Sequence, residues 1–178
     1  MIAFNSHDLE DGMRADLIDA EQLGGIKLFR DAKERAQADR IEDRIVRRTR
    51  TAKAIIDILV GECIEESNKV IRNAKIKTLD DIYSRRENLI LLPEKSSAQL
   101  KELEQFLLAN FYQHPLLLST AKQVEQWLTR LFEHFCNNPK LMPGYFQRFI
   151  DKQGLQRAVC DYIAGMTDRF CLKMVEEI

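Results

Sequence analysis

Apolar residues recur at intervals of three and four along most of this chain, which is the spacing of one face of an α-helix. The clearest pattern starts near Asp39 and includes Ile55 and Leu59. It predicts one long helix of about 30 residues. A shorter helix is predicted for residues 1–23, because the glycine pair at 24–25 provides a stop after it.

The second half of the chain shows the same helical spacing after a break. Residues 74–93 lack a clear period and are predicted to be a connector. Ser96 and Gln99 have the spacing of a capping box, and Pro115 ends the helix that they would start. The next helix carries aromatic residues that are expected in the core: Trp127, Phe132 and Phe135. A final continuous helix is predicted over residues 157–170.

The composition favours an all-α fold arranged as a multi-helix bundle. The chain has 178 residues, of which 45% are hydrophobic and 31% charged, with only 7 glycines and 4 prolines. This length allows one core, or one core with an appendage. A formal charge of −1 excludes a global basic field, so any site for a polyanion has to be local.

The cysteines and the hydropathy narrow the function classes further. Cys63, Cys136, Cys160 and Cys171 are widely spaced and lack the spacing of a metal or redox motif, so reduced and mostly buried thiols are expected. No apolar stretch has the length of a membrane span, and no leader pattern starts the chain. The expected location is therefore the cytoplasm, with no membrane partner.

Arginines crowd the start of the long predicted helix. Arg44, Arg47 and Arg48 share one face at three- and four-residue spacing, and guanidinium groups can hold phosphate oxygens in pairs of hydrogen bonds. The alternative is a solvated basic face whose charges pair with neighbouring acids: Asp39, Glu42 and Asp43. Spacing alone leaves both interpretations open.

Four segments follow the sequence pattern of a known family. Residues 2–12 read Ile-Ala-Phe-Asn-Ser-His-Asp-Leu-Glu-Asp-Gly, and residues 111–115 read Phe-Tyr-Gln-His-Pro. Residues 139–143 read Pro-Lys-Leu-Met-Pro, and residues 157–169 read Arg-Ala-Val-Cys-Asp-Tyr-Ile-Ala-Gly-Met-Thr-Asp-Arg. In this order they resemble the HD-domain deoxynucleoside triphosphate triphosphohydrolases, the dGTPase-like family. The resemblance implies a bundle that corresponds to the C-terminal part of an HD-type phosphohydrolase.

The resemblance also implies a domain division and a set of substrate contacts. Residues 1–75 would be the tail of the HD-type catalytic core with its arginine-bearing helix, and residues 76–178 the phosphohydrolase-associated helical domain. Asp8 would hydrogen-bond the sugar 3′-hydroxyl, and Phe4 stands where the family usually has a tyrosine against the deoxyribose. The phosphate candidates are the family-like pair Arg47 and Arg48, with Arg44 on the same face.

The metal of the family is expected to lie outside this chain. By the resemblance, its His, His-Asp and Asp ligands would precede Met1, so no catalytic residue, metal ligand or bound cofactor is assigned here. Mg²⁺ or Mn²⁺ is expected for the full-length family enzyme. The three histidines His7, His114 and His134 are far apart, and the His7-Asp8 doublet is interpreted as non-ligating, with a helix-start acid cluster as the alternative.

Two hypotheses follow from these patterns. In the first, the chain is a fragment or truncated homologue of an enzyme that converts a dNTP and water into deoxynucleoside and triphosphate, and it is inactive alone. In the second, it is a non-catalytic helical module for regulation or oligomerisation. The expected partners are a dNTP in the complete enzyme, a second copy or the HD half, and single-stranded DNA as an effector.

Overall fold

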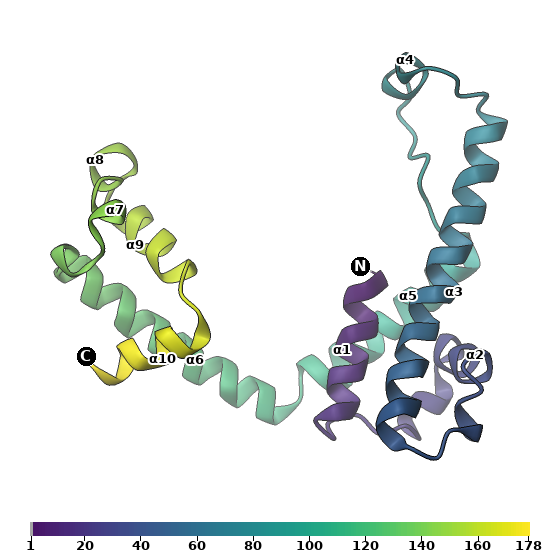
Figure 1. Cartoon of the computed structure of the whole chain (residues 1–178), viewed down its shortest axis with the longest axis horizontal. Helices are drawn as coiled ribbons and strands as arrows, with labels where there is room; N and C mark the ends of the chain where they lie inside the picture. Colours follow the sequence, from purple (N-terminus) through teal and green to yellow (C-terminus); the bar gives the residue numbers. More distant parts are fainter. Residues whose placement is uncertain (1) are drawn as a thin grey trace. The chain divides into compact units, whose positions relative to one another are not determined.

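The computed structural model describes residues 2–178, and all regular secondary structure in that range is helical (Figure 1). The all-α class is therefore confirmed. The chain divides into two compact units, Met1–His114 and Pro115–Ile178. Met1, where the first predicted helix begins, lies outside the described residues.

The first unit is built on one long helix. Its helices are α1 (Ile2–Arg14), α2 (Lys27–Arg35), α3 (Arg44–Asn73), α4 (Leu79–Tyr83) and α5 (Glu94–Leu107). Short 3₁₀ turns lie at Gln22–Gly25 and Ala38–Arg40, and a π-turn, Leu108–Tyr112, follows α5. Both α1 and α2 pack on α3, and α5 packs on α1 and α2.

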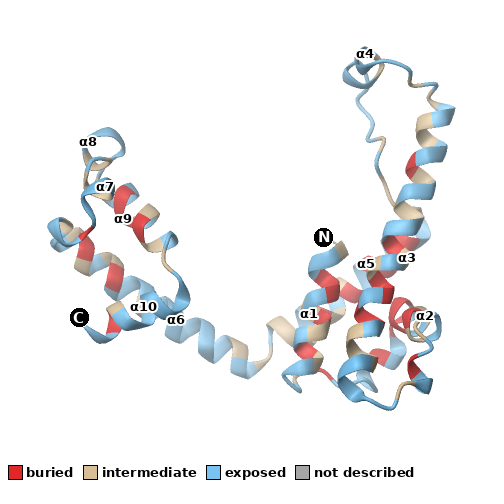
Figure 2. Ribbon diagram, viewed as in Figure 1, coloured by how far each residue is buried: buried red, intermediate tan, exposed pale blue. Residues whose placement is uncertain are grey.

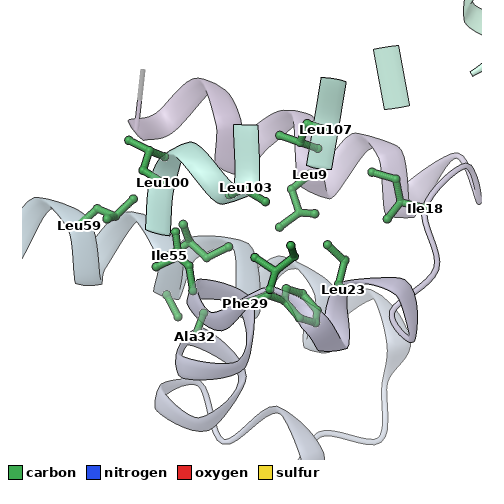
Figure 3. Packing of buried hydrophobic residues seen from close by; sticks show 13 residues of the cluster. Leu9, Ile18, Leu23, Phe29, Ala32, Ile55, Leu59, Leu100, Leu103 and Leu107 are labelled. Carbon is green, nitrogen blue, oxygen red and sulfur yellow. The ribbon is translucent and has the colours of Figure 1, made fainter. Parts of the chain in front are cut away.

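The core of this unit forms where the apolar faces of these helices meet (Figure 3). Leu9 of α1, Ile55 of α3 and Leu103 of α5 are fully buried there, and Phe29 of α2 is buried beside them. Figure 2 shows the buried positions of α1, α3 and α5 lying between those helices. Each fully buried leucine or isoleucine stabilises the fold by about 1.5–3 kcal/mol, so these positions fix how α1 lies on α3.

The first helix is shorter than the sequence predicts. It was expected to reach residue 23 but ends at Arg14, because the chain turns back at Asp16, which adopts a left-handed conformation with φ of 53°. The Ile18 amide then donates to the Gly12 carbonyl oxygen at 3.2 Å. A Cβ on Gly12 would lie 2.5 Å from Ile18 Cδ1, so any larger residue here would force the Ile18 side chain to shift.

The long helix is confirmed, with a later start than expected. α3 has 30 residues and begins at Arg44 instead of near Asp39. The Asp43 side chain accepts a hydrogen bond from the Val46 amide at 2.9 Å, which satisfies a free N–H of the first turn and sets the helix start. The helix start therefore places the three candidate arginines in its first two turns.

The region between α3 and α5 is mostly a connector, as predicted, but it contains the short helix α4. The expected capping box is wrong. α5 begins at Glu94 directly after Pro93, and the Ser97 amide donates to the Pro93 carbonyl oxygen at 2.9 Å. Ser96 and Gln99 therefore lie inside the helix, where both are buried.

The second unit packs several short helices on one long one. Its helices are α6 (Pro115–Asn137), α7 (Gly144–Gln147), α8 (Ile150–Gln153), α9 (Leu155–Ala164) and α10 (Asp168–Glu176). Both α9 and α10 pack on α6. Phe135 is fully buried, and Trp127 and Phe132 pack against the same cluster, which confirms the expected aromatic core.

The continuous final helix is wrong, because the chain breaks between α9 and α10. Gly165 follows the last residue of α9, and glycine is a poor helix former. The Thr167 hydroxyl then accepts a hydrogen bond from the Phe170 amide at 3.3 Å and starts α10 as its N-cap. The conspicuous segment 157–169 is thus a helix, a turn and the start of a second helix.

The four cysteines are all free, but the expectation of mostly buried thiols is wrong. Cys160 is exposed and the other three are half-buried. Cys136 and Cys171 pack against the core of the second unit, but at its edge, where both stay partly exposed. None of the helices described here is both long and apolar enough to cross a membrane.

Candidate functional site

A cavity of about 460 Å³ lies in the first unit beside the start of α3. It brings together four basic side chains, Lys33, Arg44, Arg47 and Arg48, and three acidic ones, Asp16, Asp19 and Asp39. The arginines come from α3, Lys33 from α2, and the acids from the segments that connect α1, α2 and α3. Apolar residues of α1 and α2, including Met13 and Phe29, line the rest.

Two of the four cations are already paired across the cavity. Arg44 forms an ion pair with Asp16, and Lys33 Nζ lies 3.1 Å from Asp39 Oδ1. All four side chains are exposed, so each pair contributes little to stability. The other two cations have fewer contacts: Arg48 has only a long ion pair with Glu10, and Arg47 has none within residues 2–178.

Arg48 is far less solvated than Arg44, whose side chain is 70% exposed. The Arg48 side chain is 13% exposed, and its Nε lies 3.8 Å from Glu10 Oε1, too far for a hydrogen bond. The Thr49 hydroxyl donates to the same carboxylate oxygen of Glu10. Arg48 Nε is buried without a hydrogen-bond partner among the described residues. A buried donor of this kind favours an incoming acceptor.

The Arg47 guanidinium makes only a weak contact within residues 2–178. Its Nη1 donates to the Ile41 carbonyl oxygen at 3.4 Å, a long hydrogen bond. A guanidinium has five N–H donors, so most of those on Arg47 are available to a ligand. Arg47 and Arg48 together could therefore hold an anionic group such as a phosphate at this end of α3.

The solvated-face alternative expected a different set of ion pairs. In the part of the chain that the structure describes, the ion pairs of Arg44 and Arg48 are made with Asp16 and Glu10. Asp43 instead caps α3, and Asp39 pairs with Lys33. Sequence spacing could not find these contacts, because Arg44 and Asp16 lie 28 positions apart.

The two sugar candidates lie on α1, away from the lining of this cavity. Phe4 and Asp8 are four residues apart, so they share one helix face. Phe4 is 61% exposed and free to stack on a ligand. Asp8 Oδ2 accepts a hydrogen bond from the Tyr112 hydroxyl. The structure thus brings the three arginines together but does not include Phe4 or Asp8 among the residues of the cavity.

Tyr112 is a site residue to which the sequence assigned no role. Burial, the hydrogen bond to Asp8 and the charge of Asp8 raise the pKa of Tyr112 to about 12. Its phenol therefore keeps its proton across the neutral range and acts as a donor to the carboxylate. The only signal in the sequence was its place in the Phe-Tyr-Gln-His-Pro segment.

The raised pKa of Tyr112 makes part of the stability pH-dependent. A folded-state pKa above the usual value of 10 means that the stabilisation is complete below pH 10 and is lost as the pH rises through about 12. We expect the difference in melting temperature between the wild type and Tyr112→Phe to shrink between pH 10 and 12. Circular dichroism melts at steps of half a pH unit measure it.

The matched control for this pH series is Tyr83→Phe, because Tyr83 of α4 is 79% exposed. This variant should follow the wild type at every pH. A difference between wild type and Tyr112→Phe that stays constant up to pH 12 would contradict the role of the phenolic proton.

No group of three or more His, Cys, Asp and Glu side chains within residues 2–178 is arranged to hold a metal ion. The carboxylates of the cavity also fit a metal poorly, because Asp16 and Asp39 already face the cations Arg44 and Lys33. We therefore assign no metal ligand to these residues.

Comparison with known proteins identifies the family. Residues 90–177 match the phosphohydrolase-associated domain. A deoxyguanosinetriphosphate triphosphohydrolase-like protein of Geobacter sulfurreducens is 36% identical over 172 residues, which are 96% of this chain and 45% of the relative. The chain is a partial homologue of the dGTP triphosphohydrolase-like family.

Other relatives of the dGTP triphosphohydrolase-like family show the same coverage. The proteins so named from Geobacter metallireducens and Ralstonia nicotianae are 33% and 31% identical, over 96% and 97% of this chain and 45% and 44% of their own length. The chain thus spans less than half of these relatives and matches their C-terminal part. The phosphohydrolase-associated match begins just before α5, so the arginine cavity lies outside it.

Proposed function

We propose that this chain supplies phosphate and sugar contacts to a dNTP triphosphohydrolase of the dGTPase type. In the complete enzyme, a dNTP and water would give a deoxynucleoside and triphosphate. The chain by itself would bind the nucleotide without cleaving it. The activity is the one named for the relatives. This chain covers 45% of the relative from Geobacter sulfurreducens, so the activity belongs to the proposal for the complete enzyme.

The observation that carries the phosphate part is the buried Nε of Arg48, which has no hydrogen-bond partner within residues 2–178. Arg48 lines the same cavity as Arg47, whose one side-chain hydrogen bond within residues 2–178 is long. A triphosphate carries several negative charges and many acceptor oxygens, and it would satisfy the free donors of both guanidinium groups. Arg44 would contribute charge, but its pair with Asp16 reduces its availability.

The sugar part of the proposal rests on α1. Asp8 would accept a hydrogen bond from the 3′-hydroxyl, and the exposed ring of Phe4 would pack against the deoxyribose. Phenylalanine has no hydroxyl, so at this position the contact would be made through ring packing alone. Mg²⁺ or Mn²⁺ belongs to the proposal for the complete enzyme, and no ligand for it is assigned in this chain.

A titration of the ¹⁵N-labelled chain with inorganic triphosphate and with dGTP tests the proposal. We expect amide shifts centred on residues 44–51 with both ligands, and further shifts on α1 with dGTP only. Incubation with dGTP and Mn²⁺ or Mg²⁺ should release no triphosphate. Sustained turnover by the purified chain, or the absence of shifts at 44–51 at millimolar ligand, would contradict the proposal.

The second candidate function is a non-catalytic module for regulation or oligomerisation. It is favoured by an apolar strip on the outside of α3, where Ile56, Val60 and Ile64 line a cavity of about 480 Å³ and the last two are exposed. Exposed apolar strips often mark contacts between proteins. A second copy, or the metal-bearing half, is the proposed partner, and single-stranded DNA stays a prediction. The titration separates the candidates, because this one requires no shift at 44–51.

A further inference from the structure

We propose that Tyr112 is a positioning residue for sugar recognition, whose hydroxyl holds the Asp8 carboxylate in the orientation that receives the 3′-hydroxyl of a deoxynucleotide. This inference rests on the proposed role of Asp8. It adds to the proposed substrate site a residue that lies near the C-terminal end of the first unit in the sequence.

The contact joins two elements that are 104 positions apart in the sequence. The Tyr112 hydroxyl donates to Asp8 Oδ2, so this oxygen has a fixed partner. A carboxylate has two oxygens, and the other one can accept a second hydrogen bond from a ligand. An exposed aspartate without such a partner would sample several rotamers, and ordering it would reduce the affinity for the sugar.

Contacts on either side of Asp8 fix α1 against the segment that carries Tyr112. One turn before Asp8, Asn5 Nδ2 donates to Glu104 Oε1 of α5 at 2.8 Å. One turn after it, Gly12 lies so close to the π-turn that an added Cβ would be 3.2 Å from the Phe111 ring. The helix that bears Asp8 therefore cannot slide or rotate without breaking these contacts.

The π-turn explains how Tyr112 reaches α1. Leu103 and Leu107 of α5 are fully buried, and the turn that follows widens, with the Gln113 amide donating to the Leu108 carbonyl oxygen at 3.3 Å. The extra residue of a π-turn changes the direction of the side chains that follow. As a result, the adjacent Phe111 and Tyr112 rings both pack against the core of the first unit.

The inference predicts a specific loss. Tyr112→Phe keeps the ring and its packing but removes the donor to Asp8. We expect the affinity for dGTP to fall about two- to tenfold, because the ligand then has to order the Asp8 side chain on binding. The affinity for 2′,3′-dideoxy-GTP should stay the same, because this ligand has no 3′-hydroxyl to reach Asp8. A purely structural role would lower both affinities together.

The experiment measures both ligands by equilibrium titration with the wild type, Tyr112→Phe, Asp8→Asn and the double variant, with Tyr83→Phe as control. The ratio of the affinity for dGTP to the affinity for 2′,3′-dideoxy-GTP should fall in Tyr112→Phe and in Asp8→Asn. The double variant should show no further loss, because Tyr112 acts through Asp8. Tyr83→Phe should keep the wild-type ratio.

Other results would contradict either the positioning role of Tyr112 or the proposed sugar contact of Asp8. An unchanged ratio in Tyr112→Phe, with a ratio lost in Asp8→Asn, overturns the positioning role and leaves the proposed function intact. A wild type that binds neither ligand, or binds both equally, overturns the proposed sugar contact and this inference with it. Equal loss for both ligands in Tyr112→Phe, with reduced helix content by circular dichroism, assigns Tyr112 to stability alone.

Discussion

Replacing Arg47 and Arg48 together by alanine is expected to weaken the binding of inorganic triphosphate about 100-fold or more. Both residues line the cavity beside α3, and both have N–H donors without a hydrogen-bond partner within residues 2–178. A hydrogen bond to a charged group is worth about 1.5–3 kcal/mol, and each 1.4 kcal/mol changes an affinity tenfold. Losing one such contact per arginine gives the expected factor. Isothermal titration at low ionic strength measures it.

The loss of triphosphate affinity in single variants should follow how far each guanidinium lacks partners within the protein. Arg48→Ala should have the largest effect, and Arg44→Ala the smallest, because Arg44 already pairs with Asp16. Salt should weaken binding in the wild type more than in the double variant. Arg48→Lys keeps the charge without the planar fork and should recover only part of the affinity.

The matched control removes two arginines from the second unit. Arg148 and Arg157 are both exposed, and within residues 2–178 the one ion pair of Arg157 is with Asp161, four residues along the same helix. Replacing both by alanine changes the net charge by the same amount but leaves the cavity intact. If this control weakened triphosphate binding as much as the Arg47 and Arg48 variant, a specific site at α3 would be wrong. Circular dichroism confirms that each variant is folded.

The sequence predicted those parts of the fold that depend on periodic burial. The 30 residues of α3 follow the apolar spacing around Ile55 and Leu59, and both of these side chains are fully buried. Pro115 and the aromatic residues of α6 were placed correctly for the same reason. In these segments a single helix face decides the structure, and that face can be identified from the sequence.

The errors occurred where a distant contact or a local cap decides the structure. α1 stops early because Ile18 returns onto Gly12, a close approach that spacing does not reveal. The last helix breaks because Thr167 caps a new one after Gly165, although the apolar stripe continues through Met166 and Phe170. Periodicity describes which face is buried, but it does not show whether the backbone is continuous.

The candidate site was predicted only in part for a related reason. Arg44, Arg47 and Arg48 lie close in sequence, so their grouping follows from one helix. Lys33 and Asp16 reach the same cavity from other elements, and Tyr112 reaches Asp8 from a turn near the end of the unit. These residues enter the site through tertiary packing, which a single sequence does not encode in any local pattern.

Phe135→Ala is expected to lower the free energy of unfolding of the second unit by about 3–5 kcal/mol. The Phe135 ring is fully buried and meets Tyr162 edge to face, with ring centroids 5.0 Å apart. Alanine would leave a cavity between α6 and α9 that the short helices around it could only partly close. Small units have a stability of only a few kcal/mol, so this change should remove most of it.

The single tryptophan makes this loss measurable. Trp127 is the only tryptophan of the chain, and it packs against the same cluster as Phe135, so its fluorescence during urea unfolding reports on the second unit. Phe170→Ala makes the same chemical change at a ring that is 41% exposed and should shift the midpoint much less. Equal shifts for the two variants would contradict a core centred on Phe135. A much larger shift for Phe135→Ala would place the stability of this unit in the contact between α6 and α9.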